Sequence, residues 1–143
     1  NFQEVDMINA VEQATGVRPS ETYLGDINLF AVFDNEDNVS NMTPNFDAVS
    51  KLDGQGLIIS SSSNQYDFVS RYFCPKYGIN EDPVTGSAHT TLIPYWSEKL
   101  NKISLEAKQV SKRGGELFCE NTENRVLIGG NAVLYMKGVI EID

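Results

Sequence analysis

The sequence predicts a mixed α+β fold in which short strands, linked by tight turns, surround one substantial helix. Apolar residues recur at helical spacing over residues 86–99. Short runs rich in β-branched and aromatic residues alternate with Gly- and Asn-containing turns through most of the remaining chain. The chain has 143 residues, 41% hydrophobic and 22% charged, which suits one globular domain with its own core. We therefore predict a single domain over residues 1–143.

The chain is expected to open with a helix. Val5, Ile8 and Val11 recur at helical spacing within residues 3–15, and Gly16 stands where a C-cap glycine would end that helix. The elements expected next are a strand at 27–33, a polar turn at 34–38, a short helix that starts within 43–47 and ends before Gly54, a strand at 56–60, a solvated serine-rich loop at 60–64 and a strand at 67–73.

The best helix is expected at residues 86–99. Ala88, Leu92 and Leu100 lie on one apolar stripe, and Lys99 suits the negative end of the helix dipole. The remainder of the chain is strand-like, with strands expected at 104–111, 116–120, 125–128 and 132–142 and turns at 113–115, 121–124 and 129–131.

The charge balance limits the classes of partner. The formal net charge is −9 and the sequence pI is about 4.5, so the long-range field repels nucleic acid and anionic membrane surfaces. One copy of Arg113-Gly114-Gly115 is therefore interpreted as a tight turn and not as an RNA-binding tripeptide. A small anion can still bind through backbone amides, because local dipoles outweigh net charge at short range.

The cysteines and the length of the apolar runs indicate the cellular compartment. No apolar run approaches the roughly 20 residues that a membrane span needs. Cys74 and Cys119 form no CxxC motif and suit reduced thiols in the cytoplasm. The chain starts with Asn1 and shows no signal-peptide pattern, and we expect it to be a piece of a longer protein.

The densest chemistry lies at residues 81–89. An acidic turn with Asp82 leads into Thr85, Gly86 and Ser87 at the start of the long helix. Thr85 or Ser87 can cap that helix, and Gly86 lets a ligand approach the backbone. Free amides at a helix start favour a carboxylate or phosphate. The alternative interpretation is structural, since an Asp-Pro turn ahead of a capped helix also occurs without function.

Three segments resemble the PhzF-like (phenazine biosynthesis PhzF) isomerase family. They are DFVSRYF at 67–73, EDPVTGSAH at 81–89 and QVSKRGGEL at 109–117. Residues 126–138 are similar to the closing strands of the family. The resemblance covers roughly residues 55–142 at family-like spacing and is looser over 1–54.

The resemblance implies a diaminopimelate-epimerase-like fold of two similar halves. Each half is a barrel-like, mostly antiparallel sheet wrapped around one central helix, and the active site lies between the halves. Residues 1–143 would be the C-terminal half, with residues 86–99 as its central helix and the N-terminal half missing. The site residues implied are catalytic Asp82 and Ser87, and substrate-binding Gly86, Ser87, Gly114 and Gly115, with no metal and no organic cofactor.

The chain also departs from the family pattern. The principal acid/base Glu of the family and its partner His belong to the first half. The lone His89 is interpreted as a packing or capping residue, with a supporting role behind the site as the alternative. No Cys lies between Glu81 and His89, so the two-thiol racemase chemistry of the same fold is not supported. Cys74 and Cys119 are interpreted as small buried hydrophobes.

Two classes of function follow. The first is half of a cofactor-independent isomerase or epimerase that moves a proton on a small carboxylate-bearing metabolite. The second is a non-catalytic half-domain, either carboxylate-binding or purely structural, that associates with itself. Partners expected are this metabolite and either a second copy in a homodimer or the missing N-terminal half.

Overall fold

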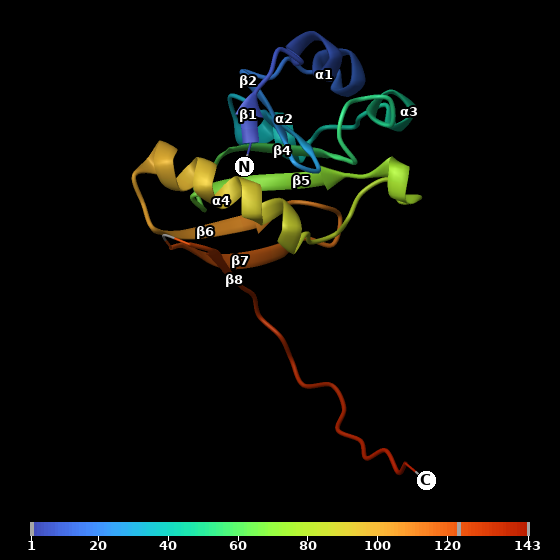
Figure 1. Cartoon of the computed structure of the whole chain (residues 1–143), viewed down its shortest axis with the longest axis vertical. Coiled ribbons are helices and arrows are strands. Elements are labelled where there is room, and N and C mark those ends of the chain that lie inside the picture. Colours follow the sequence, from blue (N-terminus) through green and yellow to red (C-terminus); the bar gives the residue numbers. More distant parts are fainter. Residues whose placement is uncertain (1, 123, 143) are drawn as a thin grey trace.

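The computed structural model describes residues 2–122 and 124–142 (Figure 1). Its strands are β1 (Phe2–Glu4), β2 (Glu21–Gly25), β3 (Leu29–Val32), β4 (Leu57–Ser62), β5 (Phe68–Phe73), β6 (Ser104–Gln109), β7 (Gly115–Asn121) and β8 (Val126–Gly129). Its helices are α1 (Ile8–Thr15), α2 (Glu36–Ser40), α3 (Phe46–Val49), the 3-10 turn η1 (Pro75–Tyr77) and α4 (Gly86–Leu100). The mixed α+β prediction is confirmed.

The strands form a single eight-stranded sheet in chain order, β1 to β8. The β3–β4 and β5–β6 pairs are parallel and the other pairs are antiparallel. The expected barrel-like enclosure is wrong in one respect, because the sheet is open: in the described residues β1 and β8 are its two edges. The helix α4 crosses one face of this sheet (Figure 1).

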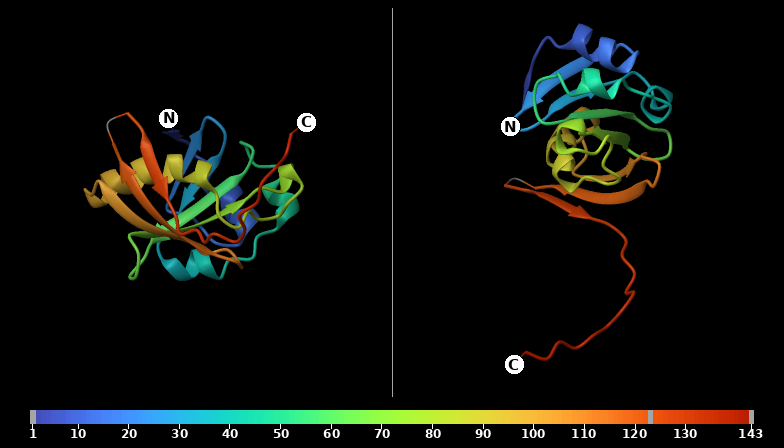
Figure 2. Two further views of the ribbon diagram at one scale, coloured as in Figure 1. Left: turned by 90° about the horizontal axis from the view of Figure 1, so that it is seen from below. Right: turned by 90° about the vertical axis from the view of Figure 1, so that its right-hand side faces the viewer.

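Alternation along the central strands divides the core into two layers. Phe30 and Ile58 pack with α4, whereas their neighbours Leu29 and Leu57 pack with α1, α2 and α3 on the opposite face. The ribbon views in Figure 2 show how these helices lie about the sheet. All four side chains are fully buried. This two-faced burial explains why β3 and β4 appear in the sequence as continuous apolar runs.

The contact between α4 and the sheet centres on Trp96. Its ring stacks on Phe68 at 5.6 Å between centroids, and its Nε1 donates to Ser60 Oγ at 2.9 Å. Ser60 in turn donates to the Val69 carbonyl at 2.6 Å. The solvated loop predicted at 60–64 is therefore wrong in its first part, since β4 continues to Ser62 and Ser60 and Ser61 are fully buried.

Three further expectations need correction. Residues 2–4 are a strand paired with β2, so the first helix spans only Ile8–Thr15, although Gly16 ends it in the left-handed conformation as expected. Strand β2 was not anticipated. The turn expected at 34–38 overlaps the first part of α2, which Asn35 caps by accepting from the Asn38 amide at 3.0 Å.

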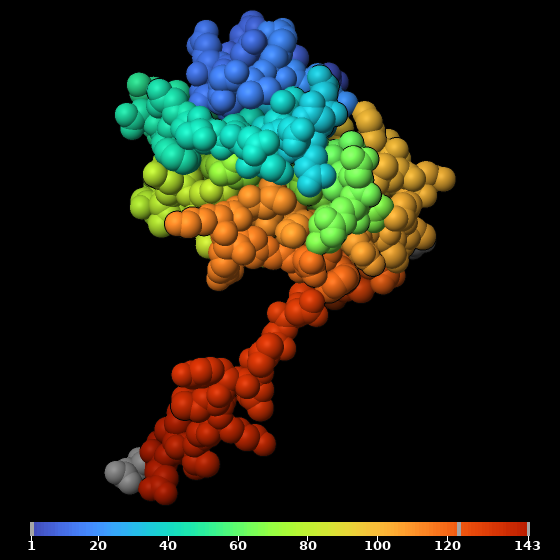
Figure 3. Space-filling view, turned by 180° about the vertical axis from the view of Figure 1, so that it is seen from behind, coloured from blue at the N-terminus to red at the C-terminus, as the bar shows by residue number. Residues whose placement is uncertain are grey.

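The strand expected at 132–142 is also not formed. Residues 130–142 have no helix or strand and extend away from β8 as a tail (Figures 1 and 3). Its apolar side chains Val133, Leu134, Tyr135, Met136, Val139, Ile140 and Ile142 are 76% to 97% exposed. The alternating pattern is typical of a strand, but a strand needs a neighbour, and no described element supplies one. No helix in residues 2–122 and 124–142 is long and apolar enough to cross a membrane.

Candidate functional site

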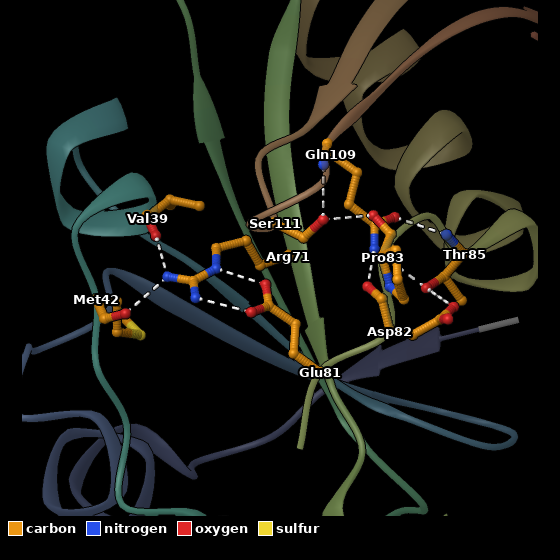
Figure 4. Close-up of polar contacts among 10 residues, drawn as sticks. Val39, Met42, Arg71, Glu81, Asp82, Pro83, Thr85, Gln109 and Ser111 are labelled. Carbon is orange, nitrogen blue, oxygen red and sulfur yellow. Dashed lines mark hydrogen bonds and ion pairs between the residues drawn. The ribbon is translucent and has the colours of Figure 1, made fainter. Parts of the chain in front are cut away.

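The acidic turn at 81–85 is fixed on one side by an ion pair. Arg71 on β5 makes a bidentate contact with Glu81, through Nε to Oε1 at 2.7 Å and Nη2 to Oε2 at 3.0 Å (Figure 4). The same guanidinium donates to the carbonyls of Val39 and Met42 at 3.2 and 2.6 Å. Arg71 therefore ties the turn to β5, to α2 and to the segment that follows α2.

The end of β6 holds the same turn from the other side. The side chain of Gln109, which is 1% exposed, accepts from the Thr85 amide at 2.8 Å and donates to the Asp82 carbonyl at 2.7 Å. Ser111 Oγ donates to the Pro83 carbonyl at 2.7 Å (Figure 4). Two side chains of the QVS segment thus satisfy three backbone groups of the turn.

The N-terminus of α4 carries no side-chain cap. Thr85 occupies the N-cap position with an extended backbone, φ −115° and ψ 100°, but its hydroxyl makes no hydrogen bond to the helix amides. The hydroxyl donates to Asp82 Oδ2 instead and accepts from Gln109 Nε2 at 3.1 Å. The positive end of the helix dipole therefore keeps amides available beside Ser87.

A cleft of about 840 Å³ opens along this helix start. Asp82, Thr85 and Ser87 line it, so two of the predicted site residues, Asp82 and Ser87, share one cavity. The remaining walls come from β1, the β2–β3 turn, the end of β5 with the segment after it, and the exposed side of α4. Their residues are Phe2, Asp26, Ile27, Asn28, Tyr72, Cys74, Tyr77, Ile79, Thr90, Thr91, Pro94 and Glu98. Polar and apolar side chains both line this cleft, as in sites for small organic ligands.

Two titratable groups in the cleft are held neutral. Tyr72 donates to Asn28 Oδ1 at 2.9 Å, and burial, with the nearby Cys74, Tyr77 and Asp82, raises the pKa of Tyr72 to about 12. Burial and the charge of Asp82 raise the pKa of Cys74. Cys74 is thus a buried thiol, in agreement with the sequence interpretation, and Cys119 is also buried and free.

His89 is a buried residue of α4 that contacts the N-cap residue Thr85. It is fully buried in α4, and its Nδ1 lies 2.8 Å from the Thr85 carbonyl. Because that carbonyl can only accept, Nδ1 carries the proton and Nε2 is bare. Nε2 has no hydrogen-bond partner among the described residues, and burial lowers the pKa of His89. The prediction of a packing or capping residue fits this arrangement.

Gly86, Gly114 and Gly115 lie outside the set of cleft-lining residues. Gly86 begins α4, and a β-carbon there would meet open space. Gly114 and Gly115 line a separate groove with Val84 and Arg113. Gly115 is needed for packing, since a β-carbon there would lie 2.5 Å from Val84 Cγ2. The structure therefore brings Asp82 and Ser87 together in one cleft and places Gly114 and Gly115 in a different groove.

Sequence reasoning missed the residues that position the site. Gln109, Ser111 and Arg71 were present in the family-like segments, but only the fold shows that their side chains meet the turn. Tyr72 and Asn28 come from segments 44 residues apart, a pairing that no local pattern indicates. Within the described part of the chain, no group of three His, Cys, Asp or Glu side chains is arranged to hold a metal ion.

The family model named "Phenazine biosynthesis-like protein" (PhzC-PhzF) matches residues 3–138. The chain belongs to this family. An uncharacterized isomerase of Pseudomonas aeruginosa is 45% identical over 97% of this chain and 53% of its own length. An uncharacterized isomerase of Halalkalibacterium halodurans is 40% identical over 90% of this chain and 49% of its own length. The chain thus spans about half the length of these curated relatives.

Solved structures of the PhzC-PhzF family agree with this fold. A PhzF family protein of Enterococcus faecalis has a TM-score of 0.89 and 50% identity over 95% of this chain and 52% of that chain. A putative phenazine biosynthesis PhzC/PhzF protein from Clostridium difficile has a TM-score of 0.84 and 44% identity over 99% of this chain and 54% of that chain. The family expected from the three sequence segments is therefore confirmed.

Proposed function

We propose that residues 1–143 form the C-terminal half of a PhzF-like, cofactor-independent isomerase or epimerase with a diaminopimelate-epimerase-like architecture, in which α4 is the central helix of this half. The family match and the isomerase names of relatives support the reaction class. The observation that carries the proposal is the uncapped start of α4, which opens beside Asp82 and Ser87 at the cleft. The two buried free thiols suit a cytoplasmic protein.

The chemistry assigned to this half is binding and charge stabilisation. The amides at the start of α4, with Ser87 Oγ, hold a substrate carboxylate and stabilise negative charge that develops when a neighbouring C–H proton is removed. The Asp82 carboxylate accepts a hydrogen bond from an amino or hydroxyl group of the substrate. The carboxylate that shuttles the proton belongs to the half that this chain does not span.

An NMR titration tests the binding role. Benzoate, a small ring carboxylate, is added to the ¹⁵N-labelled chain, and uncharged benzamide serves as the control. We expect benzoate to shift the amides of Gly86, Ser87 and Ala88, and Ser87→Ala to weaken binding roughly tenfold, the cost of one hydrogen bond to a charged group. Equal shifts by benzamide, or shifts confined to the groove at Gly114, would contradict the proposal.

The proposal also predicts that the isolated chain is catalytically silent. The proton shuttle is expected on the other half, so the chain should not exchange a substrate proton with solvent. Incubation in D₂O with a dihydro-hydroxyanthranilate or an amino acid, followed by mass spectrometry, measures this. Deuterium incorporation above the rate without protein would show that this half holds its own acid/base pair.

A further inference from the structure

The N-cap of α4 behaves differently from the N-caps of α2 and α3. In α2 and α3 the N-cap side chains Asn35 and Asn45 accept from backbone amides three residues later, at 3.0 and 3.1 Å. Thr85 has the residue type and the extended backbone of a capping residue, yet it does not cap α4. Something else in the structure determines where the Thr85 hydroxyl points.

Two groups hold that hydroxyl. The Nε2 of Gln109 donates to Thr85 Oγ1 at 3.1 Å, and this contact helps to hold the side chain in an orientation in which the oxygen does not accept from the helix amides. The single hydroxyl proton then goes to Asp82 Oδ2. Gln109 is itself fixed, because its Oε1 accepts from the Thr85 amide and its Nε2 also donates to the Asp82 carbonyl. A one-way chain of donors results, from Gln109 through Thr85 to Asp82.

We propose that Gln109 is a positioning residue that keeps the N-terminus of α4 uncapped by drawing the Thr85 hydroxyl into a relay toward Asp82. The inference rests on the proposed function, in which the free amides at the start of α4 bind an anionic group of the substrate. Gln109 does not touch the substrate in this scheme. It acts through Thr85, and one side chain thereby both frees the helix amides and holds the Asp82 carboxylate in place.

The relay predicts a specific double-variant result. In Gln109→Met the Thr85 hydroxyl loses its donor and turns to the Ala88 amide, so benzoate affinity falls about tenfold, the value of one charge-assisted hydrogen bond. Adding Thr85→Val removes the competing hydroxyl, and affinity rises again. Damage to the fold alone would give the opposite result, because a second substitution in the same turn would add to the loss.

A single substitution tests the same idea without touching the buried glutamine. In Thr85→Asn the side chain caps α4 as Asn45 caps α3, so the helix gains stability while benzoate affinity falls about tenfold. Thermal unfolding and benzoate titration of the same sample separate the two effects. Retained affinity in a variant whose Ala88 amide has become protected from hydrogen exchange would overturn the proposal.

Ser111→Ala is the matched control. Ser111 holds the Pro83 carbonyl of the same turn but takes no part in the relay. We expect it to lower stability and leave the exchange rate of the Ala88 amide unchanged, whereas Gln109→Met slows that exchange. This readout needs no ligand, so it tests the relay even when benzoate fails to bind. A Gln109→Met variant in which Ala88 exchanges as fast as in the parent would refute the relay.

Discussion

Gly86 is the residue where stability and binding are expected to separate. A β-carbon at Gly86 meets no atom within 4 Å, and its backbone does not need a positive φ. Gly86→Ala should leave the thermal midpoint unchanged or slightly higher, since Ala favours helix by up to about 1 kcal/mol. The added methyl should still weaken benzoate binding, if the ligand approaches this backbone. Unchanged affinity would place the carboxylate away from Gly86.

His89 is expected to make stability depend on pH. Burial lowers its folded-state pKa below the ordinary value of 6.5, so the unfolded chain takes up the proton first as the pH falls. The stabilisation is therefore full above about pH 6.5 and is lost as the pH drops through that value toward the folded pKa. The pKa of Glu21 is lowered from 4.5, so its contribution to the stability changes only at more acidic pH.

Urea unfolding at about pH 7 and about pH 5.5 measures this effect, and stability should be higher at the upper pH. In His89→Asn the variant keeps a donor for the Thr85 carbonyl but loses the titrating ring. Its overall stability should fall, and the difference between the two pH values should shrink. If the stability changes by the same amount between the two pH values in parent and variant, another group is responsible for the pH dependence.

The contact between the β6–β7 hairpin and the acidic turn leads to a prediction about an element. Gly115 begins β7 and lies so close to Val84 that a methyl group at this position must displace the valine. Gly115→Ala should therefore cost about 1 to 3 kcal/mol, in the range of an overpacked core. In Gly130→Ala the new β-carbon makes only an ordinary 3.6 Å contact, to the Glu116 carbonyl. Chemical denaturation should show no loss for that control.

Elements were predictable where the local pattern and the burial agree. The helix expected at 86–99 is α4, and the strand expected at 67–73 is β5, because their own residues form the buried face. The strand β1 was missed because Gln3 and Glu4 carry no apolar signal and the strand exists only by pairing with β2. The helix α2 was missed because it buries only Val39 and depends on its Asn35 cap.

The candidate site was also only partly predictable from local sequence patterns. That Asp82 and Ser87 lie close together could be predicted from a local motif, since both stand next to the start of one helix. The positions of Gly114 and Gly115 could not, because sequence proximity to a family segment does not reveal which side of the turn they occupy. Gln109 reaches Thr85 across 24 residues of sequence, and only the parallel pairing of β5 with β6 brings them together.

At the scale of the whole molecule, the tail at residues 130–142 carries the most exposed large apolar side chains of the described residues. An extended strand would place Leu134, Met136, Ile140 and Ile142 on one face, and Lys137 and Glu141 on the other face together with Val133, Tyr135 and Val139. The first face carries no charged side chain, as is typical of the buried face of a strand. The described fold leaves that face in water, and exposed apolar patches of this kind mark interaction sites.

We therefore expect the isolated chain to self-associate through its tail when the other half is not present. Repulsion from the net charge of −9 is screened beyond about 8 Å at physiological salt, so burial of the apolar face should prevail at tens of micromolar. Sedimentation measures the mass, and Leu134→Asp should shift it toward the monomer, whereas Lys137→Asp on the opposite side should shift it less. These variants should keep the parent's thermal midpoint, because the tail lies outside the two core clusters. A parent chain that stays monomeric at these concentrations would show that the apolar face does not drive pairing between copies.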